Sequence, residues 1–144
     1  MSVLHIRPAM EADAVPIARL LTQLGYPVAP EDVPTRLARL AGDRAAVLLA
    51  EQDARVVGLA TVHVLSVLNR ARDVAWLTAL VVDESMRGSG VGRRLVEAVE
   101  AFARQQGCER LSVTTHEHLT GAQAFYTQVG LPPTGRRFGK MLVS

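Results

Sequence analysis

The residues that most strongly suggest chemistry form one short glycine-rich segment. It reads Arg87-Gly88-Ser89-Gly90-Val91-Gly92 and follows an apolar run. Three glycines within five residues let the backbone turn tightly and approach a ligand without interference from Cβ atoms. A helix that follows such a turn directs its free N–H groups and the positive end of its dipole toward the turn. The segment therefore predicts a cradle for an anion, most naturally a phosphate or pyrophosphate; a glycine-rich turn with no ligand is the alternative.

Neighbouring residues narrow the choice of phosphate ligand. Arg87, Arg93 and Arg94 add fixed positive charge to the segment. A P-loop requires Gly-Lys-Ser/Thr where the helix starts, whereas two arginines follow Gly92 here. A dinucleotide fingerprint requires a third glycine where Arg93 stands, and an acidic residue closing the next strand. Glu117 lies roughly at that acidic position, but the third glycine is absent, so neither class is favoured.

The elements that must position this segment alternate along the chain. Helical spacing of apolar residues predicts helices, and short apolar or alternating runs predict strands. The run at residues 74–82 has no polar alternation, which favours a central strand buried on both faces. Together the elements predict an α/β domain with a mixed sheet. The predicted strands span residues 4–7, 45–51, 56–67, 74–82, 111–115 and 136–143, and the predicted helices span 14–24, 30–41, 93–106 and 120–128.

Length and composition exclude several classes. With 144 residues, 49% of them hydrophobic, the chain suits a single domain over residues 1–144. One cysteine, Cys108, provides neither a disulfide framework nor a cysteine-built metal site. Sixteen basic against 14 acidic residues and 4% aromatics do not suggest a nucleic-acid partner. There is no apolar run of roughly 20 residues and no signal pattern at the N-terminus, so we expect no membrane partner and a cytoplasmic location.

The pattern resembles the GNAT superfamily of N-acetyltransferases, in particular its small stand-alone bacterial members. Residues 87–92 are similar to the Gln/Arg-x-x-Gly-x-Gly/Ala acyl-CoA signature of that family. Ala122-Gln123-Ala124-Phe125-Tyr126-Thr127-Gln128-Val129-Gly130-Leu131 resembles its Ala-x-x-Phe-Tyr-x-x-x-Gly-Phe segment. The opening at residues 6–14 and the ending at residues 136–142 are also similar to those of family members. The resemblance thus covers nearly the whole chain.

The resemblance implies a fold and a cofactor site. The fold would be a mixed, mostly antiparallel central sheet of six to seven strands with about four flanking helices. Acetyl-CoA would be the cosubstrate, with no metal. Backbone groups of the predicted strand's end would hold the pantetheine arm and the thioester oxygen, and the glycine loop would hold the pyrophosphate. The cofactor-binding residues implied in this way are Leu80, Val81, Val82, Arg87, Gly88, Ser89, Gly90, Val91, Gly92 and Arg93.

The same resemblance implies a general acid for the CoA sulfur but leaves the general base for the amine open. Family members often use a tyrosine at the position of Tyr126 to protonate the departing CoA sulfur, with Phe125 facing the core. Thr78 stands where many relatives carry a carboxylate, which leaves the general base open. Candidate bases are Glu84 and His116, with Glu117 and His63 as further possibilities and deprotonation through ordered water as an alternative.

The resemblance implies acetyl transfer to a primary amine of a small molecule or protein, by direct attack in a ternary complex. A catalytically silent domain that senses acyl-CoA is the second hypothesis. An acyltransferase that acts on oxygen or uses a longer acyl chain is a third. Because small relatives often pair and open sheet edges invite pairing, we also expect a homodimer.

Overall fold

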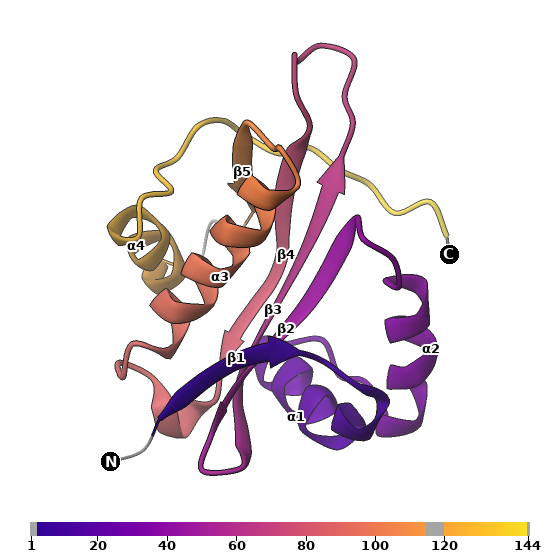
Figure 1. The fold of residues 1–144 in the computed structure, drawn as a ribbon, viewed down its shortest axis with the longest axis vertical. Helices are drawn as coiled ribbons and strands as arrows, with labels where there is room; N and C mark the ends of the chain where they lie inside the picture. Colours follow the sequence, from indigo (N-terminus) through magenta and orange to yellow (C-terminus); the bar gives the residue numbers. More distant parts are fainter. Residues whose placement is uncertain (1–2, 115–119, 144) are drawn as a thin grey trace. The chain divides into compact units, whose positions relative to one another are not determined.

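The computed structural model describes residues 3–114 and 120–143 (Figure 1). The chain divides into two compact units, Met1–Ser112 and Val113–Ser144, which are treated separately below. One sheet contains the strands in chain order. They are β1 (Leu4–Pro8), β2 (Ala45–Gln52), β3 (Arg55–Leu65), β4 (Val74–Val82) and β5 (Arg110–Val113).

The sheet is mixed and mostly antiparallel. The pairs β1–β2, β2–β3 and β3–β4 all run antiparallel. The backbone N–H of Glu109, just before β5, donates to the carbonyl of Asp73, just before β4, at 2.9 Å. β4 and β5 therefore begin at the same end of the sheet and run parallel. The helix α3 (Val91–Gln105) is the crossover that connects them.

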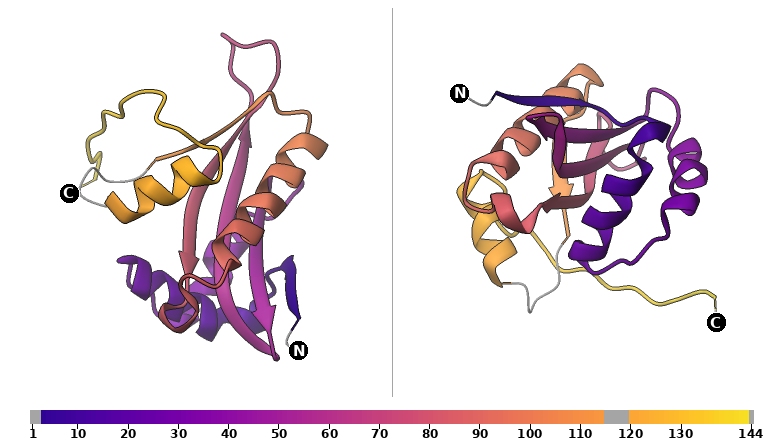
Figure 2. Two further views of the ribbon diagram at one scale, coloured as in Figure 1. Left: turned by 90° about the vertical axis from the view of Figure 1, so that its left-hand side faces the viewer. Right: turned by 90° about the horizontal axis from the view of Figure 1, so that it is seen from below.

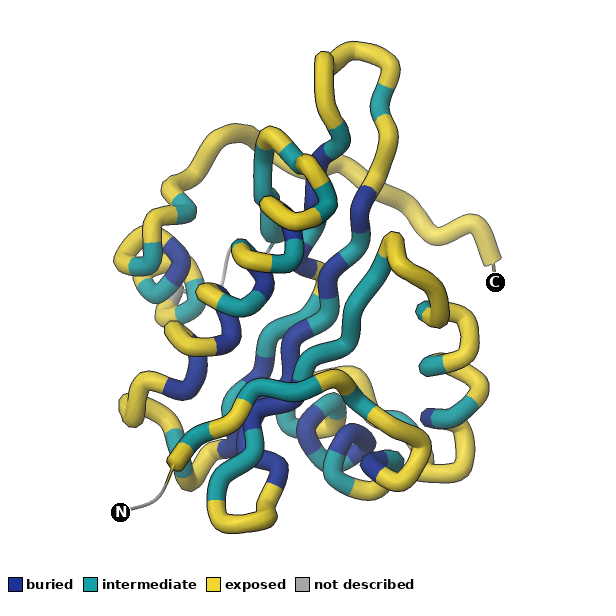
Figure 3. Tube along the Cα trace, in the orientation of Figure 1, coloured by how far each residue is buried: buried dark blue, intermediate teal, exposed yellow. Residues whose placement is uncertain are grey.

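The sheet has five strands, so the prediction of six to seven is wrong. The predicted strand at residues 136–143 does not form: these residues are extended chain without sheet pairing. Every residue from 132 to 143 is exposed, as Figure 3 shows. A strand is stable only when its backbone is paired and one face is covered. The apolar side chains of this segment, Phe138, Met141, Leu142 and Val143, are all exposed, so no face of it is covered.

Two helices cover one face of the sheet and α3 covers the other (Figure 2). Leu59 of β3 packs in a buried cluster with Ile17 and Leu20 of α1 (Ala14–Leu24) and Val33 of α2 (Val33–Arg39). Its neighbour Gly58 faces α3 instead, as alternation along a strand requires. The predicted helix at 30–41 is a 3₁₀ turn, Pro30–Asp32, followed by α2.

The start of α3 lies very close to β3. A Cβ atom on Gly58 would stand 2.8 Å from Leu95 Cδ1 and 2.9 Å from Val91 Cγ1. Only glycine therefore permits this approach. The contact fixes the beginning of α3, and with it the glycine loop, against the centre of the sheet.

The unit Val113–Ser144 contains α4 (Thr120–Gln128) and an extended tail. The N–H of Leu131 donates to the carbonyl of Tyr126 at 2.8 Å, and Gly130 closes the helix with a positive φ of 93°. No helix among the described residues is both long and apolar enough to cross a membrane.

Candidate active site

The strand β4 is interrupted by a bulge close to its predicted cofactor residues. Thr61 of β3 pairs with Ala79, but the next residue, Val62, pairs with Leu77. Thr78 is therefore the extra residue, and such a bulge bends a strand and breaks its hydrogen-bond ladder. The Thr78 hydroxyl lies 2.5 Å from the Thr61 hydroxyl and 3.2 Å from the Thr61 carbonyl. The bend precedes Leu80, Val81 and Val82 directly.

A buried carboxylate fixes the turn at the end of β4. Asp83 accepts hydrogen bonds from the Ser85 backbone N–H at 3.0 Å and the Ser85 hydroxyl at 2.8 Å. Its own N–H donates to the carbonyl of Val57 at 2.8 Å. The guanidinium groups of Arg55 and Arg19 lie 3.3 and 3.5 Å away. The Ser85 hydrogen bonds and these arginines lower the pKa of Asp83 despite its burial, so the turn is held by an ionised side chain.

The glycine loop has the conformation that its composition predicts. Gly88 and Gly90 have φ values of 80° and 91°, in the left-handed region, and Gly90 is the N-cap of α3. A Cβ atom on either would meet no atom within 4 Å. The backbone is therefore open on this side. The first N–H groups of α3 have no partner within the helix, so they can donate to a ligand.

Positive side chains surround this loop. Arg87, Arg93 and Arg94 are exposed, and Arg94 donates to the carbonyl of Leu4 at 3.4 Å. Within the part of the chain that the structure describes, neither Arg87 nor Arg93 forms an ion pair. The predicted cofactor residues thus form one continuous feature: the end of β4, the loop and the first turn of α3.

Tyr126 and Phe125 lie in α4. Their ring centroids are 5.5 Å apart in an edge-to-face arrangement. Tyr126 has an exposed fraction of 9%, whereas Phe125 is only partly buried. The expectation that Phe125 is the core residue of the pair is therefore wrong, because the apolar residues of this short helix do not mark one face clearly enough. Burial raises the pKa of Tyr126 above the ordinary value of a phenol, which is itself protonated at neutral pH.

The candidate bases are in different surroundings. Glu84 is exposed in the 3₁₀ turn Glu84–Met86, and its N–H donates to Gln23 Oε1 at 3.1 Å. His63 is partly buried on β3, opposite Trp76. His116 and Glu117 lie outside the described residues. Burial raises the pKa of the Cys108 thiol, which keeps it protonated and suits an inert cysteine.

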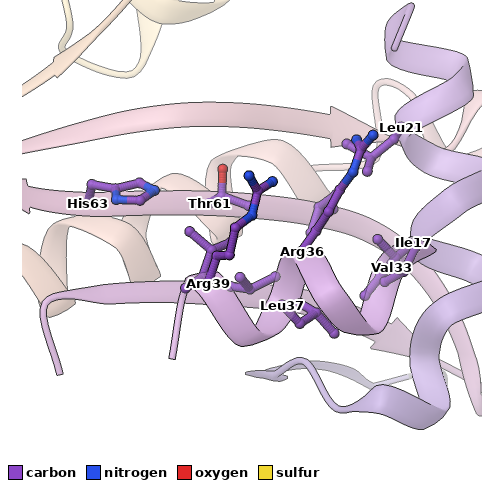
Figure 4. Close-up of a pocket in the computed structure, with 11 residues that line it drawn as sticks. Ile17, Leu21, Val33, Arg36, Leu37, Arg39, Thr61 and His63 are labelled. Carbon is purple, nitrogen blue, oxygen red and sulfur yellow. The ribbon is translucent and has the colours of Figure 1, made fainter. Parts of the chain in front are cut away.

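A cavity that sequence reasoning missed lies beside His63 (Figure 4). It has a volume of about 370 Å³ and lies among α1, α2, β2 and β3. Arg36 and Arg39 of α2, together with Thr61 and His63 of β3, are its polar lining residues. The three-residue spacing of the arginines, which puts them on one side of a helix, is the signal that could have drawn attention to them.

Comparisons with known proteins agree with this architecture. Residues 15–131 match the model of the acetyltransferase (GNAT) family. An aminoglycoside N(6')-acetyltransferase type 1 from Stenotrophomonas maltophilia is 33% identical over 135 residues, which are 91% of this chain and 88% of that protein. An aminoalkylphosphonate N-acetyltransferase from Salmonella typhimurium is 33% identical over 94 residues, which are 65% of this chain and 61% of that protein. The chain spans only 19% of another relative, N-alpha-acetyltransferase 80 of Mus musculus.

Solved structures share the fold. An aminoglycoside N-acetyltransferase solved in complex with CoA superimposes with a TM-score of 0.87, over 98% of this chain and 95% of that chain, at 21% identity. Identity this low shows the fold alone. The family match extends across most of the sequence and includes both the glycine loop and α4. The chain belongs to the acetyltransferase (GNAT) family.

Proposed function

We propose that the protein transfers the acetyl group of acetyl-CoA to a primary amine. The observation that carries this proposal is the continuous β4–loop–α3 feature. Its backbone is open at Gly88 and Gly90, and its Arg87 and Arg93 form no ion pair with any residue that the structure describes. In a member of an acetyltransferase family, the anion that suits this feature is the pyrophosphate of CoA.

The residues present fit acetyl-CoA. The space above Gly88 and Gly90, which a Cβ would enter, leaves room for a pyrophosphate to approach the backbone N–H groups. The arginines supply charge-assisted hydrogen bonds to phosphate oxygens. Backbone groups of Leu80, Val81 and Val82 would hold the pantetheine arm, beyond the bulge at Thr78. Acetyl-CoA supplies the activated acetyl group as a thioester.

The protein's part in the reaction is to orient groups and to move protons. N–H groups at the end of β4 would polarise the thioester carbonyl as charge develops on its oxygen. The acceptor amine must lose a proton as its nitrogen forms the new amide bond, and the departing sulfur must gain one. Tyr126, whose phenol is protonated at neutral pH and whose pKa burial raises further, is the proposed acid. The base is Glu84, His116, His63, Glu117 or an ordered water.

A domain that binds acyl-CoA without turnover is the second candidate. It is favoured by Thr78, which offers a hydroxyl instead of a carboxylate at the bulge, and by the exposure of Glu84. In both cases we propose that residues 1–144 act as one domain, because the family match crosses the boundary between the two units.

An amine panel distinguishes the two candidates. The panel contains aminoglycosides, polyamines, amino acids and N-terminal peptides, and free CoA thiol is measured with and without each amine. We expect acceptor-dependent release, with the acetylated amine found by mass spectrometry. Acetyl-CoA binding without release for any amine would favour the silent domain, and no binding at all would refute both.

A further inference from the structure

The cavity between α2 and the sheet has an apolar wall and a positively charged rim. Its wall contains Ile17, Leu21, Val33, Leu37, Val47 and Leu59. Arg36 and Arg39 complete the lining from α2, and Figure 4 shows their side chains extending in the same direction as the Thr61 hydroxyl. Among residues 3–114 and 120–143, no acidic residue lines this cavity; Asp43 lines an adjoining hollow instead. Apart from Thr61 and His63, the side chains that face a bound molecule here are therefore apolar or those of the two arginines.

The two arginines have no partner for their charge. In the described part of the chain, neither Arg36 nor Arg39 forms an ion pair or a side-chain hydrogen bond. The next arginine, Arg44, is different, because it lies 2.8 Å from Asp73. Guanidinium groups recognise carboxylate and phosphonate oxygens through paired hydrogen bonds. The rim is thus suited to an anion supplied from outside the chain.

The cavity is connected with the proposed reaction site through Thr61. This residue lines the cavity, and its hydroxyl lies 2.5 Å from that of Thr78, at the β4 bulge. β4 continues directly into Leu80–Val82. A molecule in the cavity therefore lies against β3, the strand next to the one that we assign to the acetyl thioester, and Thr61 joins the two. The volume of about 370 Å³ is at the small end for ligand pockets, which suits a small molecule.

We infer that the acceptor is a small primary amine that also carries an acidic group, a carboxylate or a phosphonate, on a compact apolar body. This inference rests on the proposed function, in which the acetyl group passes from acetyl-CoA to the bound amine. The acidic group binds Arg36 and Arg39, the apolar body packs on α1, α2 and β3, and the amine points toward the β4 bulge. Acceptors with several ammonium groups, such as aminoglycosides and polyamines, are disfavoured because they place like charges beside the arginines.

A matched ligand series tests the charge preference. Benzylamine, 4-(aminomethyl)benzoate, its phosphonate counterpart and 4-(aminomethyl)benzylamine share a ring and a reactive amine but differ in the charge of the para group. Binding is measured by calorimetry in saturating CoA, so that the glycine loop is already filled, and turnover is measured by acetyl-amine formation. We expect one or both anionic ligands to bind at least tenfold more tightly than the neutral and dicationic ones. The carboxylate and phosphonate arms show which acid is preferred.

Variants assign the preference to the cavity. In the double variant Arg36→Gln/Arg39→Gln, we expect about a tenfold loss of affinity for the anionic ligand and less than a twofold change for benzylamine. Arg36→Glu/Arg39→Glu should reverse the order in favour of the dication. Arg104→Gln, which removes an exposed arginine from α3, is the control and should change neither. Melting curves verify that each variant is folded.

The outcomes separate this inference from the proposed function. Preferential anion binding without acetylation of any ligand would support the cavity assignment and refute the transferase. Acetylation of neutral or dicationic amines as efficiently as anionic ones would support the transferase and overturn the inference. Equal effects of the cavity variants and Arg104→Gln, or no binding of any ligand at 10 mM, would also overturn it.

Discussion

Replacement of Gly90 by alanine distinguishes a ligand-binding loop from a merely structural one. Gly90 has a φ of 91°, and a Cβ there would meet no protein atom within 4 Å. The cost to the fold is therefore backbone strain alone, about 1–2 kcal/mol for an alanine in the left-handed region. In a chain of this size that lowers the melting temperature by about 3 to 6 °C.

Acetyl-CoA affinity should fall in addition to this strain, because the new Cβ lies where the pyrophosphate approaches the backbone. We expect at least a tenfold loss of affinity, about 1.4 kcal/mol. At a ligand concentration 100 times the parent Kd, acetyl-CoA stabilises the parent by about 2.7 kcal/mol. The same concentration is only about ten times the variant's Kd, so the stabilisation should fall to about 1.4 kcal/mol.

Gly107 provides a matched control at the other end of α3. It has a φ of 79° and equally open surroundings, so Gly107→Ala should cost the fold about as much without changing acetyl-CoA binding. The assay is thermal unfolding of both variants with and without ligand, with Kd from calorimetry. If both variants retain the parent's Kd, the loop is structural. If both lose affinity equally, the effect comes from α3 as a whole, and in either case the reasoning is refuted.

Four further predictions follow from the same structure. Tyr126→Phe should lower turnover about 10²-fold, the low end for acid–base catalysis, with acetyl-CoA affinity and melting temperature nearly unchanged; turnover within twofold of the parent would place the acid elsewhere. Gly58→Ala should destabilise the protein by about 1–3 kcal/mol through overpacking against Val91 and Leu95. The free energy of unfolding in urea measures this effect, and an unchanged value would contradict the close packing. The pKa of Asp83 is lowered in the folded protein, so its ionised form stabilises the fold above pH ~4, and this contribution is lost as pH falls through the folded pKa. Asp83→Asn should therefore lower the free energy of unfolding by about 1–3 kcal/mol at pH 7. In urea titrations the difference between variant and parent should shrink progressively toward pH 3. A homodimer is expected at micromolar concentration, and light scattering that gives the mass of one chain would exclude it.

Local sequence signals predicted the glycine loop well. The loop depends on glycines that adopt positive φ and on a helix that starts beside them, and both are properties of residues close together in the chain. The run at residues 74–82 was likewise predicted as a strand with the same bounds as β4. The family resemblance was confirmed by the family model and by relatives that cover most of the chain.

Features that depend on pairing or packing were not predictable in this way. The bulge at Thr78 exists only because β3 and β4 pair with a shift between Thr61 and Val62. The cavity depends on how α2 lies over β2 and β3, so the three-residue spacing of Arg36 and Arg39 could not by itself show that they line a cavity. The segment at residues 136–143 has apolar residues at plausible strand positions, but strand formation requires a partner that local sequence cannot supply.

The central claim is that the β4–loop–α3 feature binds acetyl-CoA, and amide NMR spectra of the ¹⁵N-labelled protein during an acetyl-CoA titration test it most directly. We predict that the largest saturable shifts fall on the amides of residues 80–82 and 88–93, and that an equal concentration of ATP leaves residues 80–82 unmoved. Saturable binding that leaves all of these amides unchanged, or no shifts with millimolar acetyl-CoA, would contradict the account.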